Sequence, residues 1–363
     1  MRSSVLAGVI AATACAAVQA QGTFIPLETP NAQATKISQN GDYLTAFVAG
    51  TGGMRWIRAT GEEQLVQGMD YSNGVNNLGT VSGAIPVDGG TGNGGHDLPA
   101  VSPLGASAPQ ELPLPAGTDN ANVYDVADDG SAVGLAWSDD FSVAKAYYWT
   151  SADGAIDLPV TDSSTASRAN AISADGTVIG GWNDDPDTGF RRGVIWQNRV
   201  PFYPLDATGA NVGEADGVSG NGQFVVGSTY SNEDGSVTSW RWNADTDEVI
   251  SIPVMPFAFG VSDDGKTIVG ASGFFDDPPR AAYIWTEANG SQLLSDYLAA
   301  HAVDVPDGWD FSGGLTAVSG DGSQIAGWTL FSPDGMRSFV VTGLNAPGDD
   351  IFLDGFDGTP NAE

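Results

Sequence analysis

The chain has 363 residues and carries 45 acidic against 13 basic side chains, which gives a net charge of −32. Such a charge repels phosphate backbones and excludes nucleic acid as a partner. A single cysteine excludes a disulfide framework, and 49 glycines with 20 prolines indicate many short strands joined by tight turns.

Residues 1–20 have the character of a signal peptide. Arg2 is followed by an apolar stretch, residues 5–14, that is too short to span a bilayer, and small residues precede the cut expected between Ala20 and Gln21. Two alternatives remain open, a buried N-terminal helix and a lipoprotein anchored through Cys15. We expect a secreted or cell-surface protein, and a monomer, with no membrane span because no later run of eighteen apolar residues exists.

The rest of the chain repeats itself. An apolar residue, then usually Ser or Asn, then a turn ending in Gly, then an apolar run recurs seven times. The turn glycines are Gly41, Gly79, Gly130, Gly176, Gly222, Gly265 and Gly322. They lie about 47 residues apart on average, the usual size of a four-stranded propeller blade.

Asn or Asp precedes the turn glycine in six copies, which indicates a two-residue hairpin turn with positive φ angles. The second copy has Leu78 there, so its turn is the least certain to match the others. A further glycine closes the next strand in five copies and suggests close backbone approach where blades converge on an axis. These glycines are Gly134, Gly180, Gly227, Gly270 and Gly327.

An aromatic residue follows the turn in six copies, in four of them as a Trp 19 or 20 residues after the turn glycine, and the second copy has none. The set is Trp56, Trp149, Trp196, Trp242, Trp285 and, in the last copy, Phe339. One large ring per repeat is typical of packing between neighbouring blades, with ligand stacking as the alternative. The one helix expected is residues 292–302, with Leu293, Leu294, Tyr297 and Leu298 on one face.

Short apolar runs after the aromatic positions supply a fourth, outer strand, but the last copy has none. Residues 23–28, TFIPLE, can supply it from the N-terminus. We therefore predict an all-β fold over residues 21–345: a seven-bladed β-propeller of four-stranded blades, closed by an N-terminal strand in the last blade. The alternative is an open array or two separate domains.

The pattern A-x-x-[IV]-S-x-[DN]-G-x-x-[IV]-x-G, followed by a run ending in Trp, resembles the HAF-type extracellular repeats of bacterial exported proteins. Residues 169–182, ANAISADGTVIGGW, match it best. The resemblance implies an extracellular repeat protein without an assigned enzymatic activity. The His-Ala-Phe signature itself is absent, since the matching places read, for example, Ala146-Tyr147-Tyr148, so no residue role carries over. Residues 346–363 form an acidic tail that resembles a sorting signal, with a flexible tail as the alternative.

The sequence contains few of the residues that are typical of catalytic or metal sites. Only His96 and His301 are present, which argues against a His/Cys zinc site, and no G-x-S-x-G elbow marks a serine nucleophile. Calcium is the one possible cofactor, because alternating oxygen ligands occur in two turns, although Asp-rich hairpin turns explain the same pattern. The candidate ligands are Asp185, Asp187, Asn243, Asp245 and Asp247.

Three tryptophans outside the repeat position, Trp137, Trp182 and Trp328, follow the second strand of their copies and are candidates for stacking on a ligand, or for local packing. The function predicted is a non-enzymatic extracellular binding module for a glycan or protein, and the alternative is a propeller glycan hydrolase. Two carboxylates with a basic residue in the channel would favour the hydrolase. A channel lined by the repeat serines and small residues would favour binding.

Overall fold

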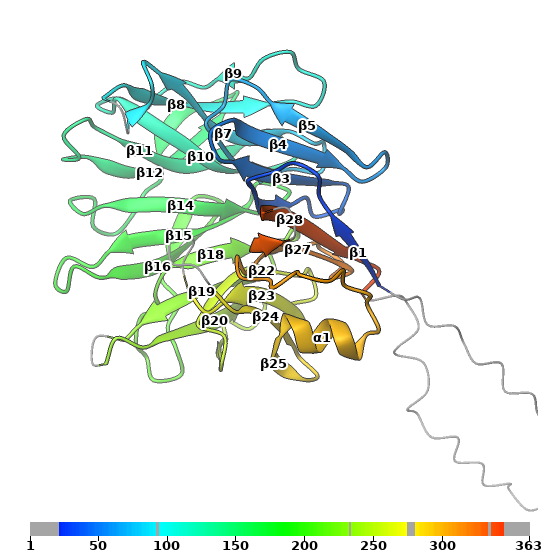
Figure 1. Cartoon of the computed structure of the whole chain (residues 1–363). Helices are drawn as coiled ribbons and strands as arrows, with labels where there is room; N and C mark the ends of the chain where they lie inside the picture. The colour runs from blue at the N-terminus through cyan, green and yellow to red at the C-terminus, as the bar shows by residue number, and fades with distance from the viewer. Residues whose placement is uncertain (1–21, 92–93, 232–233, 274–279, 333–334, 345–363) are drawn as a thin grey trace, which may run out of the picture.

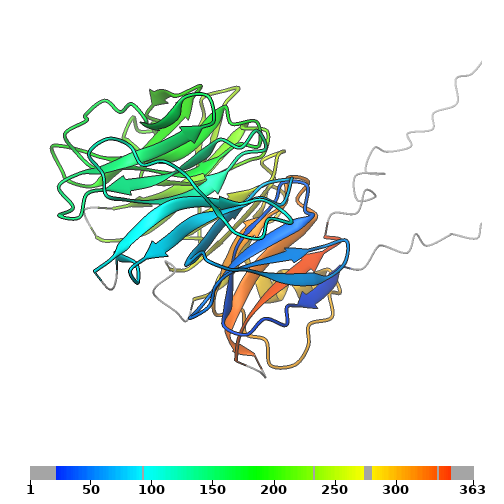
Figure 2. The same cartoon turned by 90° about the horizontal axis from the view of Figure 1, so that it is seen from above.

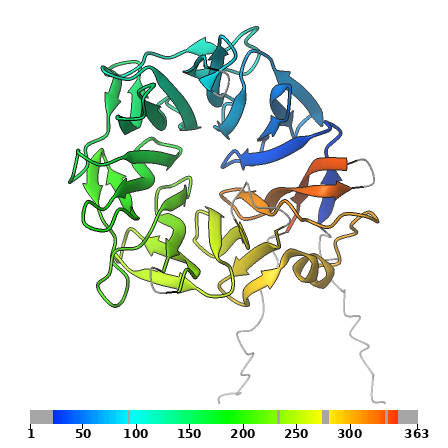
Figure 3. The same ribbon diagram turned by 60° about the vertical axis from the view of Figure 1, so that its left-hand side comes forward.

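Seven four-stranded antiparallel sheets surround a central channel in the computed structural model, so the chain folds as a seven-bladed β-propeller (Figures 1 and 3). The structure describes residues 22–91, 94–231, 234–273, 280–332 and 335–344. The expected signal-peptide cut at Ala20 and Gln21, Cys15 and the acidic tail lie outside these residues. No helix in the described ranges is long and apolar enough to cross a membrane.

Each blade has an innermost strand along the channel and three strands stacked outward from it. The innermost strands are β2 (Ala32–Ile37), β6 (Tyr71–Val75), β10 (Asn120–Val126), β14 (Ser167–Ile172), β18 (Ala215–Val218), β22 (Phe257–Val261) and β26 (Leu315–Val318). The second strands are β3 (Tyr43–Val48), β7 (Val81–Val87), β11 (Ala132–Trp137), β15 (Val178–Asp184), β19 (Phe224–Tyr230), β23 (Thr267–Ala271) and β27 (Gln324–Ser332).

The third strands are β4 (Gly52–Ile57), β8 (His96–Ser102), β12 (Ala144–Thr150), β16 (Arg191–Gln197), β20 (Val237–Asn243), β24 (Ala282–Thr286) and β28 (Gly335–Thr342). The outermost strands are β5 (Glu62–Val66), β9 (Gln110–Glu111), β13 (Gly154–Asp157), β17 (Val200–Phe202), β21 (Val249–Ile252), β25 (Gly290–Leu293) and β1 (Thr23–Pro26). We number the blades one to seven from β2, β6, β10, β14, β18, β22 and β26.

The N-terminal strand closes the ring, as the sequence predicted. β1 pairs antiparallel with β28, from Thr23 opposite Thr342 to Pro26 opposite Phe339 (Figure 1). Phe24 is buried by this pairing and stacks on Phe339 at 5.2 Å between ring centroids. The last blade therefore contains the first and the last strand of the propeller, and β1 covers the edge of β28.

A separate apolar cluster fills each of the seven interfaces between neighbouring blades. The repeat tryptophans belong to these clusters, and Trp196 and Trp242 are fully buried, which confirms the packing role. The last blade differs from the expectation. Val341, opposite Ile325, stands where five of the other six blades have Trp, and Phe339 lies two residues earlier, opposite Gly327. Val341 is 19 residues after Gly322, as Trp149 is after Gly130, so Phe339 was chosen for its aromatic ring and not by its distance from the turn.

The repeated turns are not two-residue hairpins. In blade four the loop has four residues between Ser173 and Val178, and only Gly176 has a positive φ, of 76°. The Asp175 carboxylate accepts hydrogen bonds from the Ser173 hydroxyl at 2.7 Å and from the Thr177 amide at 3.0 Å. Asp or Asn is thus selected here as an acceptor that closes the loop, not for tolerance of positive φ.

The second blade keeps this turn in spite of Leu78. Gly79 has φ 75°, and its amide donates to the Asn76 carbonyl at 3.0 Å, as in the other copies. The Asn76 side chain takes over the bridging role and accepts from the amides of Leu78 and Thr80. One asparagine therefore replaces the Ser and Asp pair.

The helix is shorter than expected. α1 covers Leu294–Ala300, because residues 290–293 form the outer strand β25 of blade six. Leu294, Tyr297 and Leu298 are buried against blades six and seven, whereas Leu293 is 40% exposed. Figure 3 shows the helix on the periphery of the ring, away from the channel, and in Figure 2 it lies behind the strands of blades one and seven.

Candidate functional site

Every innermost strand contains a β-bulge, which the sequence analysis did not predict. In blade four, for example, Ala169 pairs with Gly181 and Ala171 with Gly180, so Asn170 has no partner of its own. The same register shift occurs in all seven blades. A bulge leaves one residue unpaired and re-aims its side chain.

The bulges explain the strand-closing glycines. A β-carbon on Gly181 would overlap the Arg168 carbonyl oxygen, and one on Gly227 would overlap that of Glu214. The close approach is therefore between two strands of one blade, opposite the bulge, and not at the convergence of blades on the axis. In blade four the glycine that meets this constraint is Gly181, since the neighbours of Gly180 are side chains of blade five.

The seven bulge residues point into the channel. They are Thr35, Asn73, Tyr124, Asn170, Asp216, Phe259 and Thr316. All of them line a cavity of about 420 Å³, the size of a site for a small molecule. We call this cavity the cup.

Four of the seven bulge side chains are used in holding blades together, because each donates to a carbonyl of the next blade's innermost strand. The bonds run from Thr316 to Ala34 at 2.9 Å, from Thr35 to Ser72 at 2.8 Å, from Asn73 to Val123 at 2.9 Å and from Asn170 to Ala215 at 2.8 Å. The acceptor is the residue just before the bulge in every case. These hydrogen bonds between blades account for the residue types at the four positions.

The other three, Tyr124, Asp216 and Phe259, depart from this pattern. A phenylalanine ring has no hydrogen to donate, a tyrosine hydroxyl lies far from its backbone, and the Asp216 carboxyl group is partnered by the Ser228 hydroxyl within its own blade. Their side chains line the cup in blades three, five and six. The hydrogen bonds between blades therefore do not account for these three residue types.

Further aromatic rings line the cup. Phe47 and Tyr71, from blades one and two, stack with their centroids 6.1 Å apart, and Phe259 stacks on Phe257 at 6.4 Å. The Arg168 guanidinium lies 5.2 Å from the centre of the Tyr124 ring. The cup therefore combines several aromatic rings with polar side chains.

A charged cluster supports blade four at the cup. The buried Glu214 forms ion pairs with Arg168 and, at 2.5 Å, with Arg191, and also accepts from the Asn170 amide at 2.8 Å. Trp182 lies beneath both guanidinium groups, 5.4 Å from Arg168 and 4.5 Å from Arg191. Both carboxylate oxygens of Glu214 are engaged, so this acid fixes Arg168 in place.

Asp216 is the acidic residue among those lining the cup. Burial, and next the nearby Glu214 carboxylate, raise the pKa of Asp216 well above its usual range, against the opposing effect of Arg168. The Ser228 hydroxyl lies 3.2 Å from one carboxylate oxygen. Asp216 is therefore a weakly partnered carboxyl group that favours its neutral form.

Lys36 enters the cup from blade one and pairs with Asp125 of blade three. The Asp125 carboxylate also accepts from the Ile172 amide at 3.0 Å and the Val126 amide at 2.9 Å. Gly74 of blade two leaves room for this bridge, since a β-carbon there would lie 2.6 Å from an Asp125 oxygen. The Asp125 carboxylate thus has three partners within the protein, and its negative charge compensates the positive charge of Lys36.

One end of the channel is closed by the repeated turns, which are hydrogen-bonded to one another around the whole ring. The links are Asn40 to Asn77, Asn77 to Asp128, Asp128 to Ala174, Ala174 to Gly220, Asn221 to Asp263, Asp263 to Gly320, and Gly320 to Gln39. Gln39 crosses the centre, because a β-carbon on Gly220, in blade five, would lie 2.6 Å from its Cγ. Gln39 is part of the cup lining, so the cup has a floor.

The three candidate tryptophans lie within second strands, with Trp137 at the end of β11 and Trp182 and Trp328 inside β15 and β27, and none lines the cup. Trp182 and Trp328 occupy equivalent positions one residue after the strand-closing glycine, and Trp137 lies two positions further along its strand. Their exposed fractions are 6%, 1% and 9%, so little ring face is open to a ligand. Of the three, Trp182 comes nearest to the cup through its contact with Arg168.

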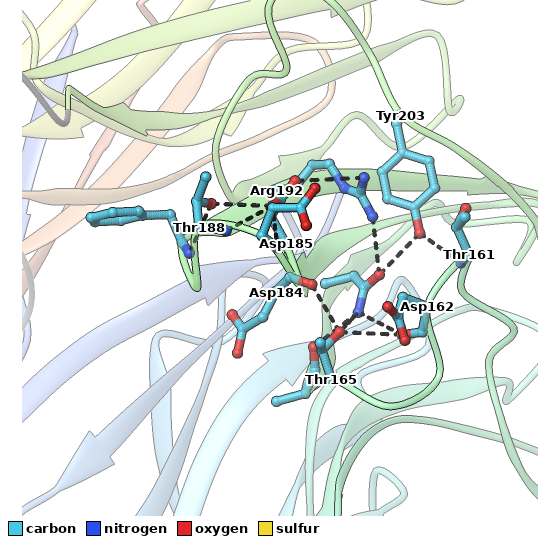
Figure 4. A network of polar contacts seen from close by, with 12 residues as sticks. Thr161, Asp162, Thr165, Asp184, Asp185, Thr188, Arg192 and Tyr203 are labelled. Carbon is cyan, nitrogen blue, oxygen red and sulfur yellow. Dashed lines mark hydrogen bonds and ion pairs between the residues drawn. The ribbon is translucent and has the colours of Figure 1, made fainter.

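The calcium candidates lie in closed hairpin turns. Asp185 accepts from the amides of Asp187 and Thr188, both at 3.0 Å, and lies 3.8 Å from Arg192 (Figure 4). Asn183, Thr165 and Tyr203 continue this network beneath the turn. Asn243 accepts from the Asp245 amide and from Gln223, and Asp247 has a positive φ of 56°. Within the described ranges, no group of three or more His, Cys, Asp or Glu residues is placed to hold a metal ion.

The two histidines are apart from the cup. His96 Nδ1 lies 3.4 Å from an Asp139 oxygen, and His301 Nδ1 is 2.8 Å from the Tyr297 carbonyl. The repeat serines do not line the channel either, since Ser38, Ser173, Ser219, Ser262 and Ser319 are buried within the turns. The lining is instead set by the bulge residues.

No family model and no curated protein matches this chain. Solved structures do. An oligogalacturonate lyase from Vibrio parahaemolyticus is similar with a TM-score of 0.53 and 12% identity, covering 88% of this chain and 91% of that chain. The WD40 β-propeller domain of Doa1 gives 0.51 and 16%, covering 87% and 94%. TolB from Acinetobacter baumannii gives 0.43 and 11%, covering 86% and 78%. At these identities the similarity to the lyase and to the Doa1 domain shows the β-propeller fold alone.

The sequence does contain a signal for the bulges. In the repeat A-x-x-[IV]-S the Ala and the Ile or Val are three residues apart, yet both are buried, as Ala34 and Ile37 are. A regular strand would place them on opposite faces, so one extra residue must lie between them.

Proposed function

We propose that this chain is an exported, non-enzymatic binding module of the HAF-repeat type whose ligand enters the cup. The observation that carries the proposal is the departure of Tyr124, Asp216 and Phe259 from the structural pattern of the bulge residues. Stability does not require these residue types. A glycan or protein outside the cell is the partner class that suits the predicted compartment and the acidic surface.

The arrangement of carboxylates supports binding over hydrolysis. Glycoside hydrolases generally use two carboxyl groups on either side of the scissile bond. Here Asp216 lines the cup, whereas Glu214 is held by two arginines and Asp125 by Lys36 and two backbone amides. A second acid that is free to exchange a proton is missing from the lining residues.

A glycan-cleaving enzyme is the second candidate. The raised pKa of Asp216 would suit a general acid, and one structurally similar protein is an oligogalacturonate lyase. This candidate predicts turnover that is abolished by Asp216→Asn, and the binding module predicts none.

The test is an array of glycans and surface proteins probed with residues 21–363, in wild-type form and as Tyr124→Ala. Phe190→Ala is the matched control, because Phe190 is an exposed aromatic outside the cup lining. We expect at least one ligand that wild type and the control retain and Tyr124→Ala loses. Ligands that bind all three proteins equally, or ligands that are cleaved, contradict the proposal.

A further inference from the structure

The cup can be entered from one end alone. Its lining runs along β2 from Gln33 through Thr35, Lys36 and Ile37 to Gln39, where the ring of hydrogen-bonded turns and the Gln39 side chain form the floor. A polymer cannot thread through such a site. Only a small molecule, or the end of a longer chain, can reach the lower lining.

The walls suit a ring that is flat, apolar on its faces and polar at its edge. Phe47 and Tyr71 of blades one and two stack on each other, and Tyr124 of blade three and Phe259 of blade six add two further rings to the wall. Asp216 and Arg168 provide an acceptor and a donor between them. Sugar rings present axial C–H groups to aromatic faces and hydroxyl groups to polar side chains, so this combination matches a pyranose.

Each basic group at the cup already has a carboxylate partner within the protein. Glu214 holds both Arg168 and Arg191, and Asp125 holds Lys36. A carboxylate on the ligand would have to share a basic group with these acids, and a cationic ligand would lie beside Lys36 and Arg168, the two basic side chains of the lining. The chain's net charge of −32 further disfavours anions.

We propose that the cup binds the terminal residue of a neutral glycan, which enters end-on and packs against the aromatic rings of the wall with Asp216 hydrogen-bonded to its hydroxyl groups. This inference rests on the proposed function and specifies its ligand. It predicts that chain ends are recognised and internal sugar residues are not.

Isothermal titration calorimetry with residues 21–363 tests this inference. The probes are neutral manno-, xylo-, cello-, chito- and maltohexaose, with tetragalacturonate as the anionic probe and a chitosan hexamer as the cationic probe. We expect a neutral hexasaccharide to bind, with affinity falling about tenfold or more in Tyr124→Ala and in Asp216→Asn and staying constant in Phe190→Ala. The isosteric Asp216→Asn keeps the test valid if Tyr124→Ala does not fold.

Entry by the chain end is tested with the same sugar as a long polymer. Affinity per mole of chain ends is expected to equal that of the hexasaccharide, and for a maltohexaose ligand the cyclic hexamer, which has no ends, is expected not to bind. Binding in proportion to internal residues overturns end-on entry.

The remaining outcomes separate this inference from the proposed function. Preference for tetragalacturonate or chitosan, or absence of any sugar binding, overturns the neutral-glycan ligand. If the array then shows a peptide or protein that binds wild type and not Tyr124→Ala, the binding module stands and the glycan is wrong. If no ligand on the array depends on Tyr124, both proposals fail.

Discussion

Deleting residues 22–28 removes β1, and with it the closure of the ring. Phe24 and Leu27 lose their buried positions, at 8% and 1% exposure, and each such side chain contributes about 1.5–3 kcal/mol. The free energy of unfolding should therefore fall by about 3–6 kcal/mol, before any loss from the pairing of β1 with β28. For a chain of this size the melting temperature should drop by on the order of 10 °C.

Thermal melts followed by circular dichroism, with size-exclusion chromatography for association through the exposed β28 edge, measure this effect. Phe24→Ala should reproduce most of the loss, about 3–5 kcal/mol, and Thr23→Ala, at the exposed start of β1, should have little effect. A synthetic peptide of residues 22–29, added in trans, should restore part of the lost stability. If the truncated chain melts at the wild-type temperature, closure by β1 does not stabilise the propeller and the reasoning is wrong.

Three further predictions concern stability. Because burial raises the pKa of Asp216 above its ordinary 3.8, the neutral carboxyl stabilises the fold at low pH and this contribution is lost as pH rises through the folded-state pKa. The free energy of unfolding of Asp216→Asn should therefore exceed that of wild type at pH 8 by on the order of 1 kcal/mol, and this difference should shrink towards pH 4. A melting temperature below that of wild type at pH 8 would refute the assignment. Gly181→Ala should cost about 1–3 kcal/mol in urea unfolding because its β-carbon overlaps the Arg168 carbonyl oxygen, and Gly180→Ala, which meets the Val218 side chain at 3.1 Å, should cost less; the reverse order would contradict the bulge account. Chelation by EDTA should leave the melting temperature unchanged, since Asp185 is engaged by its own turn; a fall would restore calcium at Asp185 and Asp187.

The periodic features of the sequence were enough to predict the architecture. Seven turn glycines gave the number of blades, the tryptophans gave the packing between blades, and the spare TFIPLE segment gave the ring closure. These features are visible because each depends on a local requirement that recurs in every blade. Blade two keeps the same turn, although a different residue, Asn76, accepts the hydrogen bonds that close it.

The site was not predicted in the same way. The cup depends on which residue of each innermost strand is left unpaired, and this follows from a strand register that the pattern of buried residues and the turn geometry set together. The Ala-x-x-[IV] spacing contains this information, but we expected regular strands, and for the same reason Gly180 was chosen over Gly181. Phe339 was chosen for its aromatic ring, although Val341 lies at the repeat distance from Gly322. Tyr124, Asp216 and Phe259 stand out once the bonds made by the other four bulge residues are known.

The proposal that the cup is the ligand site is tested most directly by a crystal structure of the protein bound to the ligand that the array or calorimetry identifies. Our account predicts one sugar residue in the cup, against Tyr124 and Phe259 and hydrogen-bonded to Asp216, with the rest of the chain leaving through the open end. A ligand on the outer loops, such as those that carry Phe141 and Phe190, or on the face of the hydrogen-bonded turns, would contradict it.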